Sequence, residues 1–134
     1  MVDDVDHDLL PIFLEEAKEI IPLVGNSMRR WRVAPINHVP VTELERHLHT
    51  LKGSARMAGL MRLGELAHVI ESRIIAMDQT AEPAKNEFDL VDESVDRLNA
   101  AIDRLAAGDF SPIAVELPAI SDVSQDLPAP LAVM

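Results

Sequence analysis

A histidine, two cations and a glycine share one face of a predicted helix near the middle of the chain. His49, Lys52, Gly53 and Arg56 follow one another at steps of three or four residues, so they stack along one side of an α-helix. Leu48 and Leu51 adjoin them but point inward, to the apolar side. The pattern therefore predicts an imidazole that stands in solvent with positive charge and an empty position beside it.

These residue types suit a histidine that accepts a phosphoryl group. Neutral imidazole, with a reference pKa of about 6.5, is a competent nucleophile near neutral pH. The Lys52 ammonium can offset the charge of a bound phosphoryl group, and Arg56 adds positive charge for an acidic partner. Gly53 costs about 0.5–1 kcal/mol in a helix interior, and it leaves room for a partner's active site. Taken singly, His49 and Lys52 are more simply ordinary surface residues, and Gly53 is a site of close helix–helix packing, although it lies off the apolar stripe. Their conjunction favours phosphotransfer.

The segment His49-Thr50-Leu51-Lys52-Gly53-Ser54-Ala55 resembles the phosphoacceptor motif of histidine phosphotransfer (HPt) domains. The longer run to Gly59 is most similar to the HPt modules of CheA-like hybrid kinases that control twitching motility through type IV pili. The resemblance covers roughly residues 5–107. It implies that His49 is the phosphoacceptor.

The resemblance also assigns two residues on the following helix. In CheA-type modules a glutamate and a histidine there face the phosphoacceptor ring, and Glu71 and His68 occupy these positions. The glutamate would accept a hydrogen bond from Nδ1–H and leave Nε2 as the nucleophile. Without the resemblance, Glu71 is more simply a solvated helix charge. The alternative for His68 is that it only supports the site.

The implied partners are a histidine kinase ATP-binding domain and CheY-like receiver domains. The chain itself is expected to be no autonomous enzyme and to hold no cofactor, because it lacks the glycine-rich loops that cradle phosphates. ATP and Mg²⁺ would come with the partner domains. The alternative function is an HPt-like interaction bundle that binds signalling partners without being phosphorylated.

Helical periodicity predicts the elements that position this face. Apolar residues recur at three- and four-residue steps in four segments, at about residues 9–32, 41–58, 62–78 and 85–107. Asp8 is the expected N-cap of the first helix, and Pro22 predicts a kink in it. Residues 33–40 read as a connector, and Gly59 as the C-cap glycine of the second helix. Short connectors make neighbours antiparallel, so we expect an all-α, up-down four-helix bundle.

The last segment differs in composition. Residues 111–134 contain four prolines and no Lys or Arg, which predicts a disordered Pro/Ala-rich tail. The expected division is therefore a bundle over residues 1–110 and a linker or tail over residues 111–134.

Charge and composition argue against several kinds of partner and binding site. The net charge of −11 disfavours nucleic acid and anionic membranes as partners. No metal site is expected, because His47 and His49 point about 200° apart on a helix and cysteine is absent. The acidic start of the chain is no signal peptide. We expect a cytoplasmic protein, and a monomer because no exposed apolar stripe is evident.

Overall fold

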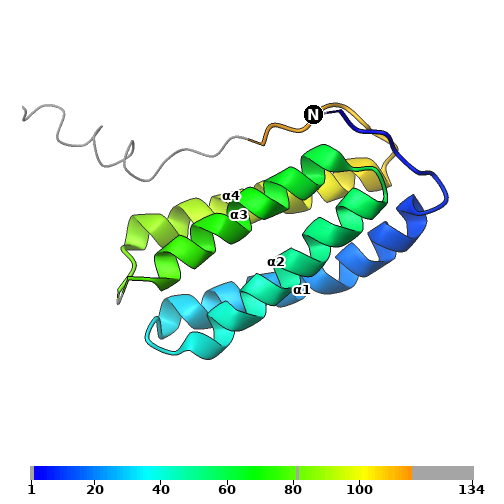
Figure 1. The fold of residues 1–134 in the computed structure, drawn as a ribbon. Helices are drawn as coiled ribbons and strands as arrows, with labels where there is room; N and C mark the ends of the chain where they lie inside the picture. Colours follow the sequence, from blue (N-terminus) through cyan, green and yellow to red (C-terminus); the bar gives the residue numbers. More distant parts are fainter. Residues whose placement is uncertain (1, 81, 116–134) are drawn as a thin grey trace, which may run out of the picture.

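The computed structural model describes residues 2–80 and 82–115, which form four α-helices and no β-strand. The helices are α1 (Leu10–Val33), α2 (His38–Met57), α3 (Met61–Asp78) and α4 (Lys85–Ala106). Successive helices run in opposite directions (Figure 1). The prediction of an all-α, up-down four-helix bundle is confirmed.

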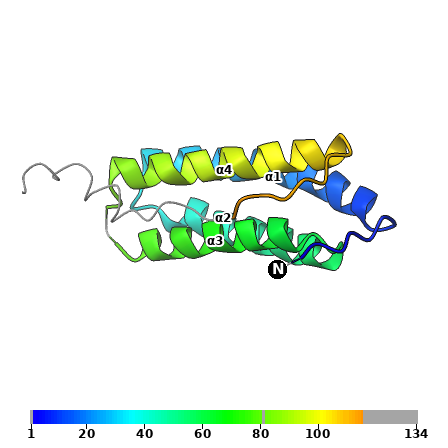
Figure 2. The same ribbon diagram turned by 90° about the horizontal axis from the view of Figure 1, so that it is seen from above.

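The helices pack in a ring, in which each contacts its two neighbours: α1 with α2, α2 with α3, α3 with α4, and α4 with α1. Seen from above, α4 covers α1 while α3 and α2 form the other side (Figure 2). In this arrangement α2 lies between α1 and α3. One flank of α2 therefore borders each of these helices, and its outer face is left to solvent.

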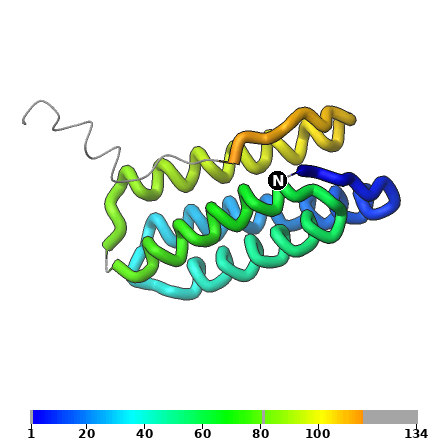
Figure 3. Tube along the Cα trace, turned by 45° about the horizontal axis from the view of Figure 1, so that its top comes forward, coloured from blue at the N-terminus to red at the C-terminus, as the bar shows by residue number. Residues whose placement is uncertain are grey.

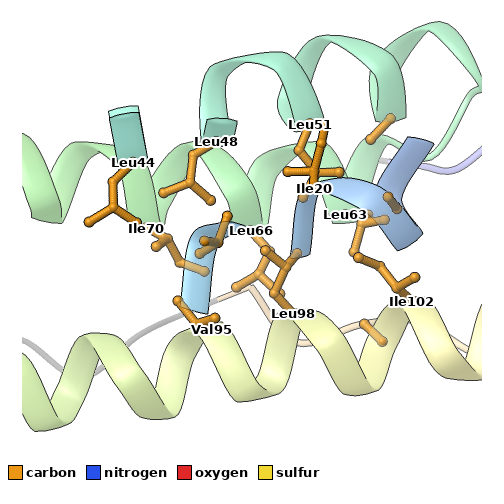
Figure 4. Packing of buried hydrophobic residues seen from close by; sticks show 14 of the residues in the cluster. Ile20, Leu44, Leu48, Leu51, Leu63, Leu66, Ile70, Val95, Leu98 and Ile102 are labelled. Atoms are coloured by element: carbon orange, nitrogen blue, oxygen red, sulfur yellow. The ribbon is translucent and has the colours of Figure 1, made fainter. Parts of the chain in front are cut away.

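The core consists of the apolar stripes that the sequence predicts. Leu44, Leu48 and Leu51 of α2 are fully buried, and they lie opposite side chains from α3 and α4 (Figure 4). The predicted stripes of α1, α3 and α4 are buried as well, from Leu10 to Trp31, Leu63 to Met77 and Phe88 to Leu105. This packing fixes the rotation of α2, and hence which of its residues face outward.

Two helix starts differ from the expectation. Asp8 does not cap α1: the N-cap residue is Leu9, without a side-chain cap, and the Asp6 carboxylate accepts hydrogen bonds from the amides of Asp8 and Leu9 instead. The second helix begins at His38 rather than Val41, because Asn37 caps it by accepting from the amide of Val39. Proline is tolerated in a first helical turn, so Pro40 does not delay the start. The true connector is only residues 34–37.

Other boundaries agree with the sequence. Pro11 lies in the first turn of α1, and α1 continues without interruption through Pro22; the kink there stays a prediction. Gly59, with φ of 79°, follows the C-cap of α2. The amide of Leu60 donates to the carbonyl of Ala55, which closes the helix as a Schellman turn.

Both ends of the described chain pack against the start of α3. Asp4 N donates to Gly59 O, and Asp3 Oδ1 accepts from the amide of Arg62. After α4 the chain turns back along the bundle toward α3 (Figures 2 and 3). Ile113 is buried in the core, and its carbonyl accepts from Arg62 Nη1. The division at residue 110 stays a prediction, but contacts with the bundle continue past it. The prediction for residues 116–134 lies outside the described residues.

Candidate phosphoacceptor site

His49 stands on the outer face of α2 with 71% of its side chain exposed. Leu48 and Leu51 beside it are buried in the core, so the helix has no freedom to turn this ring inward. The expected solvent-facing imidazole is therefore present.

Glu71 approaches this imidazole from α3. Its Oε2 lies 3.5 Å from His49 Nδ1, which is longer than a well-formed hydrogen bond. Glu71 itself is 8% exposed, and it is the one charged residue that is buried among those the structure describes. The contact leaves Nε2 as the nitrogen that points away from the carboxylate.

Lys52 pairs with the other oxygen of the same carboxylate. Its Nζ lies 2.8 Å from Glu71 Oε1, and only 13% of the lysine side chain is exposed. Burial of a lone carboxylate is costly, and a close ammonium offsets that cost. Lys52, three residues after His49 on α2, thus has its charge compensated by Glu71.

His68 lies one turn before Glu71 on α3, with Nδ1 3.8 Å from Glu71 Oε1. This nitrogen is buried and has no hydrogen-bond partner among the described residues. The structure therefore brings His68 to the carboxylate, at a greater distance than Lys52.

Gly53 and Arg56 occupy opposite flanks of the exposed face. A Cβ atom added at Gly53 would meet nothing within 4 Å, so this position is open. Arg56 leans toward α3, where Nη2 lies 3.7 Å from Glu65 Oε1. A Cβ at Gly64 would lie 2.8 Å from Arg56 Cγ, so the absent side chain of Gly64 makes room for the arginine.

Sequence reasoning overlooked several residues around His49. Glu45 and Arg46 precede it by four and three residues, and Met57 follows at the next step beyond Gly53; the same helical spacing could have found all three. Met57 is 75% exposed and Ile12 of α1 is 64% exposed. They border a recess of about 140 Å³ between α1 and α2. Two apolar side chains are thus exposed on this flank, and the expectation of a monomer stays a prediction.

The carboxyl group of Glu45 has a raised pKa. Burial is the main cause, and the negative charges of Asp78 and Glu71 add to it. A second acidic group therefore lies close enough to Glu71 to feel its charge.

Other site types find little support among the described residues. No cluster of three or more His, Asp or Glu side chains there could hold a metal ion. None of the helices described is long and apolar enough to cross a bilayer.

Comparison with known proteins decides the family. The Hpt domain family matches residues 8–108, which includes all four helices and every site residue above. The chain belongs to the Hpt family. Membership implies a role in histidine phosphotransfer, and it confirms the broader part of the resemblance.

The chain is similar to chemotaxis proteins named CheA. It is 30% identical to CheA of Halobacterium salinarum over 101 residues, 75% of this chain and 15% of that protein. It is 28% identical to CheA of Borreliella burgdorferi over 106 residues, 79% of this chain and 12% of that protein. The Hpt chain thus spans a small part of these relatives. No solved structure matched it.

Proposed function

We propose that His49 accepts a phosphoryl group from a histidine kinase ATP-binding domain and exchanges it with aspartates of CheY-like receiver domains. The observation that carries this proposal is the exposed imidazole whose Nδ1 faces the buried carboxylate of Glu71 at 3.5 Å. A carboxylate at Nδ1 favours the tautomer with the proton on that nitrogen, and the lone pair then lies on Nε2.

In the proposed first step, the Nε2 lone pair attacks the γ-phosphorus of ATP. The bond from that phosphorus to the bridging oxygen breaks, and ADP leaves with the electron pair. Movement of about half an ångström would bring Nδ1–H of His49 into hydrogen-bond range of Glu71, which stabilises the positive charge that develops on the ring.

In the second step, a carboxylate oxygen of the receiver attacks the phosphorus. The nitrogen–phosphorus bond breaks and its electron pair returns to Nε2 of His49. The chain holds the ring and its tautomer, while ATP and Mg²⁺ come with the partner domains. We therefore propose that this chain catalyses no reaction alone.

Lys52 has two parts in this proposal. Its ammonium pairs with Glu71 at 2.8 Å in the resting state. Lys52 also follows His49 by one helical turn, so its charge can offset that of a phosphoryl group on the ring. Arg56 and the open position at Gly53 belong to the surface that the partner covers, and His68 supports Glu71.

The setting is proposed from the motif. The run from His49 to Gly59 is most similar to modules of CheA-like kinases of type IV pilus systems, so we propose a chemotaxis-type phosphorelay that controls twitching, in the cytoplasm and with a monomeric module. A chromosomal His49→Gln allele in the source organism should abolish twitching and spare swimming. The opposite result would place the module in a flagellar system.

Phosphorylation with a radiolabelled donor tests the function itself. Each kinase ATP-binding domain of the source organism is incubated with radiolabelled ATP and the chain. We expect label that is lost in acid and stable in base, as a phosphohistidine requires. His49→Gln should abolish it. His38→Gln, a change at another exposed histidine, should leave it unchanged.

The alternative function gives a different result in the same experiment. An interaction bundle that binds signalling partners without phosphorylation would label neither the wild-type chain nor either variant. Label on a residue other than His49 would also contradict the proposal.

A further inference from the structure

A recess lies between α1 and α2, on the α1 side of α2, whereas Glu71 approaches His49 from α3. Its volume is about 260 Å³. It is lined by Leu23, Asn26 and Arg30 of α1 and by Glu43, Arg46 and His47 of α2.

The charges of Arg30 and Glu43 cancel within this recess. Both terminal nitrogens of Arg30 lie 2.8 Å from Glu43 Oε1, and Nη1 also donates to Asn26 Oδ1 at 3.1 Å. Ser27 Oγ donates to the same glutamate oxygen at 3.0 Å. This pair is therefore already satisfied, and it provides a neutral, hydrogen-bonded wall.

Arg46 is the uncompensated charge of the recess. It is exposed, and no ion pair joins it to any residue in the described part of the chain. Burial lowers the pKa of the adjacent His47, and the charge of Arg46 lowers it further, against a smaller opposing effect of Glu43. The histidine therefore adds hydrogen-bonding capacity at neutral pH without adding charge.

Arg46 also differs from the cations on the other flank of His49. Lys52 is mostly buried against Glu71, and Arg56 leans on Glu65. Arg46 precedes His49 by three residues, which places their Cβ atoms about 5–6 Å apart on the helix surface. Of these three cations, Arg46 is the one whose charge remains available to a partner.

We propose that Arg46 receives a carboxylate of the receiver domain that exchanges phosphate with His49. This inference rests on the proposed function and names the contact that docks the partner. The guanidinium of Arg46 can bind a carboxylate in a bidentate manner, and the side-chain amide of Asn26 lines the same recess. A molecule with a net charge of −11 otherwise repels an acidic surface, so this flank is where the acidic rim of a receiver can approach.

Arg46→Gln is the variant that tests the docking role. The assay measures transfer from phosphorylated His49 to the receiver domain that accepts phosphate fastest, at a series of receiver concentrations. Loss of a rim charge weakens encounter and its salt dependence more than the chemical step. We expect the half-saturating receiver concentration to rise roughly three- to tenfold, with the maximal rate within about twofold.

Two further variants sharpen the result. Arg46→Lys should restore part of the apparent affinity, and Arg46→Glu should lower it below that of Arg46→Gln. Arg104→Gln is the matched control, since it removes the same charge from an exposed position in the last turn of α4. It should transfer phosphate as the wild type does, with the wild-type dependence on salt.

Different results would contradict the docking role of Arg46 and the proposed phosphotransfer through His49. If Arg46→Gln behaves like Arg104→Gln, or lowers the maximal rate at unchanged half-saturation, Arg46 does not dock the receiver while phosphotransfer stands. If no receiver of the source organism accepts phosphate from wild-type His49, both the proposed function and this inference are wrong. Thermal melts of all variants identify any that fail to fold.

Discussion

Lys52 and Glu71 form an ion pair next to His49, with Nζ 2.8 Å from Oε1, while the second carboxylate oxygen lies 3.5 Å from Nδ1 of the imidazole. One buried carboxylate thus contacts two groups, because one of its oxygens lies 3.5 Å from Nδ1 of His49 and the other pairs with the ammonium of Lys52. Changes at Glu71 should affect the histidine tautomer and the stability of the fold at the same time.

Glu71→Ala should abolish the preference of His49 for the Nδ1–H tautomer and leave Lys52 partly buried without a counter-ion. We expect the free energy of unfolding to fall by about 1–3 kcal/mol, and phosphorylation to slow. Proton–nitrogen correlation NMR reports the tautomer, and a urea titration reports stability.

Glu71→Gln separates the two effects. The amide keeps the shape and an acceptor oxygen but removes the charge, so the tautomer preference should persist in part. Equal tautomer populations in wild type and Glu71→Ala would show that Glu71 does not orient the ring of His49.

Gly53 offers a test of partner access. No atom lies within 4 Å of a Cβ built there, so Gly53→Ala should raise the free energy of unfolding by about 1 kcal/mol through helix propensity. Gly53→Leu should fold as well but slow transfer roughly ten- to a hundredfold, because a misplaced partner loses reactive geometry. The measurements are a thermal melt and the transfer assay.

Ala100→Leu is the matched control for Gly53→Leu, since it adds a leucine at an exposed position of α4. It should leave transfer unchanged. A Gly53→Leu variant that transfers at the wild-type rate would mean that no partner approaches this position.

The sequence alone could predict the bundle and the facing of His49, because both follow from periodicity. An apolar stripe as regular as Leu44, Leu48 and Leu51 leaves one rotation of α2. The first residue of a helix is harder to predict from spacing, because it depends on local hydrogen bonds of the capping residue. The spacing predicts that the second helix begins at Val41, but Asn37 caps it and it begins at His38.

The partners of each charge could not be predicted, since they depend on how α2 and α3 are placed side by side. Spacing put Lys52 and Arg56 on one face with His49, but it could not show that Glu71 and Glu65 across the helix interface compensate them. The position of Gly64 in the sequence does not indicate a function for it. Its role in admitting Arg56 appears only when the two helices are packed.

Replacement of Glu45 by an uncharged residue should stabilise the fold, by an amount that depends on pH. Burial, then the charges of Asp78 and Glu71, raise its pKa above the ordinary 4.5, so the folded chain binds this proton more tightly than the unfolded chain. Ionised Glu45 therefore opposes folding at neutral pH. Glu45→Gln should raise the free energy of unfolding at pH 7 by on the order of 0.5 kcal/mol.

The gain from Glu45→Gln should disappear as pH falls below 4.5, where the carboxyl group is protonated in both the folded and the unfolded states. Glu93→Gln makes the same change at an exposed position of α4 and should show no such pH dependence. Urea titrations from pH 4 to pH 7 measure both variants. A gain that is constant over this range would contradict the assignment.

Gly59 joins the N-terminal residues to the α2–α3 turn, and its replacement should release them. Its φ is 79°, and a Cβ atom there would lie 1.8 Å from the carbonyl oxygen of Asp4. Gly108 has a similar φ of 86° but open space around it. In both Gly→Ala variants, left-handed backbone strain should lower the free energy of unfolding by roughly 1–2 kcal/mol. In Gly59→Ala the clash with Asp4 should lower it by about 1–3 kcal/mol more.

The difference between the two variants in urea titrations therefore isolates the contact with Asp4. Hydrogen exchange at the amides of Asp4 and Asp6, which donate to Gly59 and Ala58, should accelerate in Gly59→Ala and stay slow in Gly108→Ala. Because Asp3 also caps the start of α3, release of this segment should loosen the helix that carries Glu71. Equal losses of stability in the two variants would mean that the N-terminal residues contribute nothing to holding α3 in place.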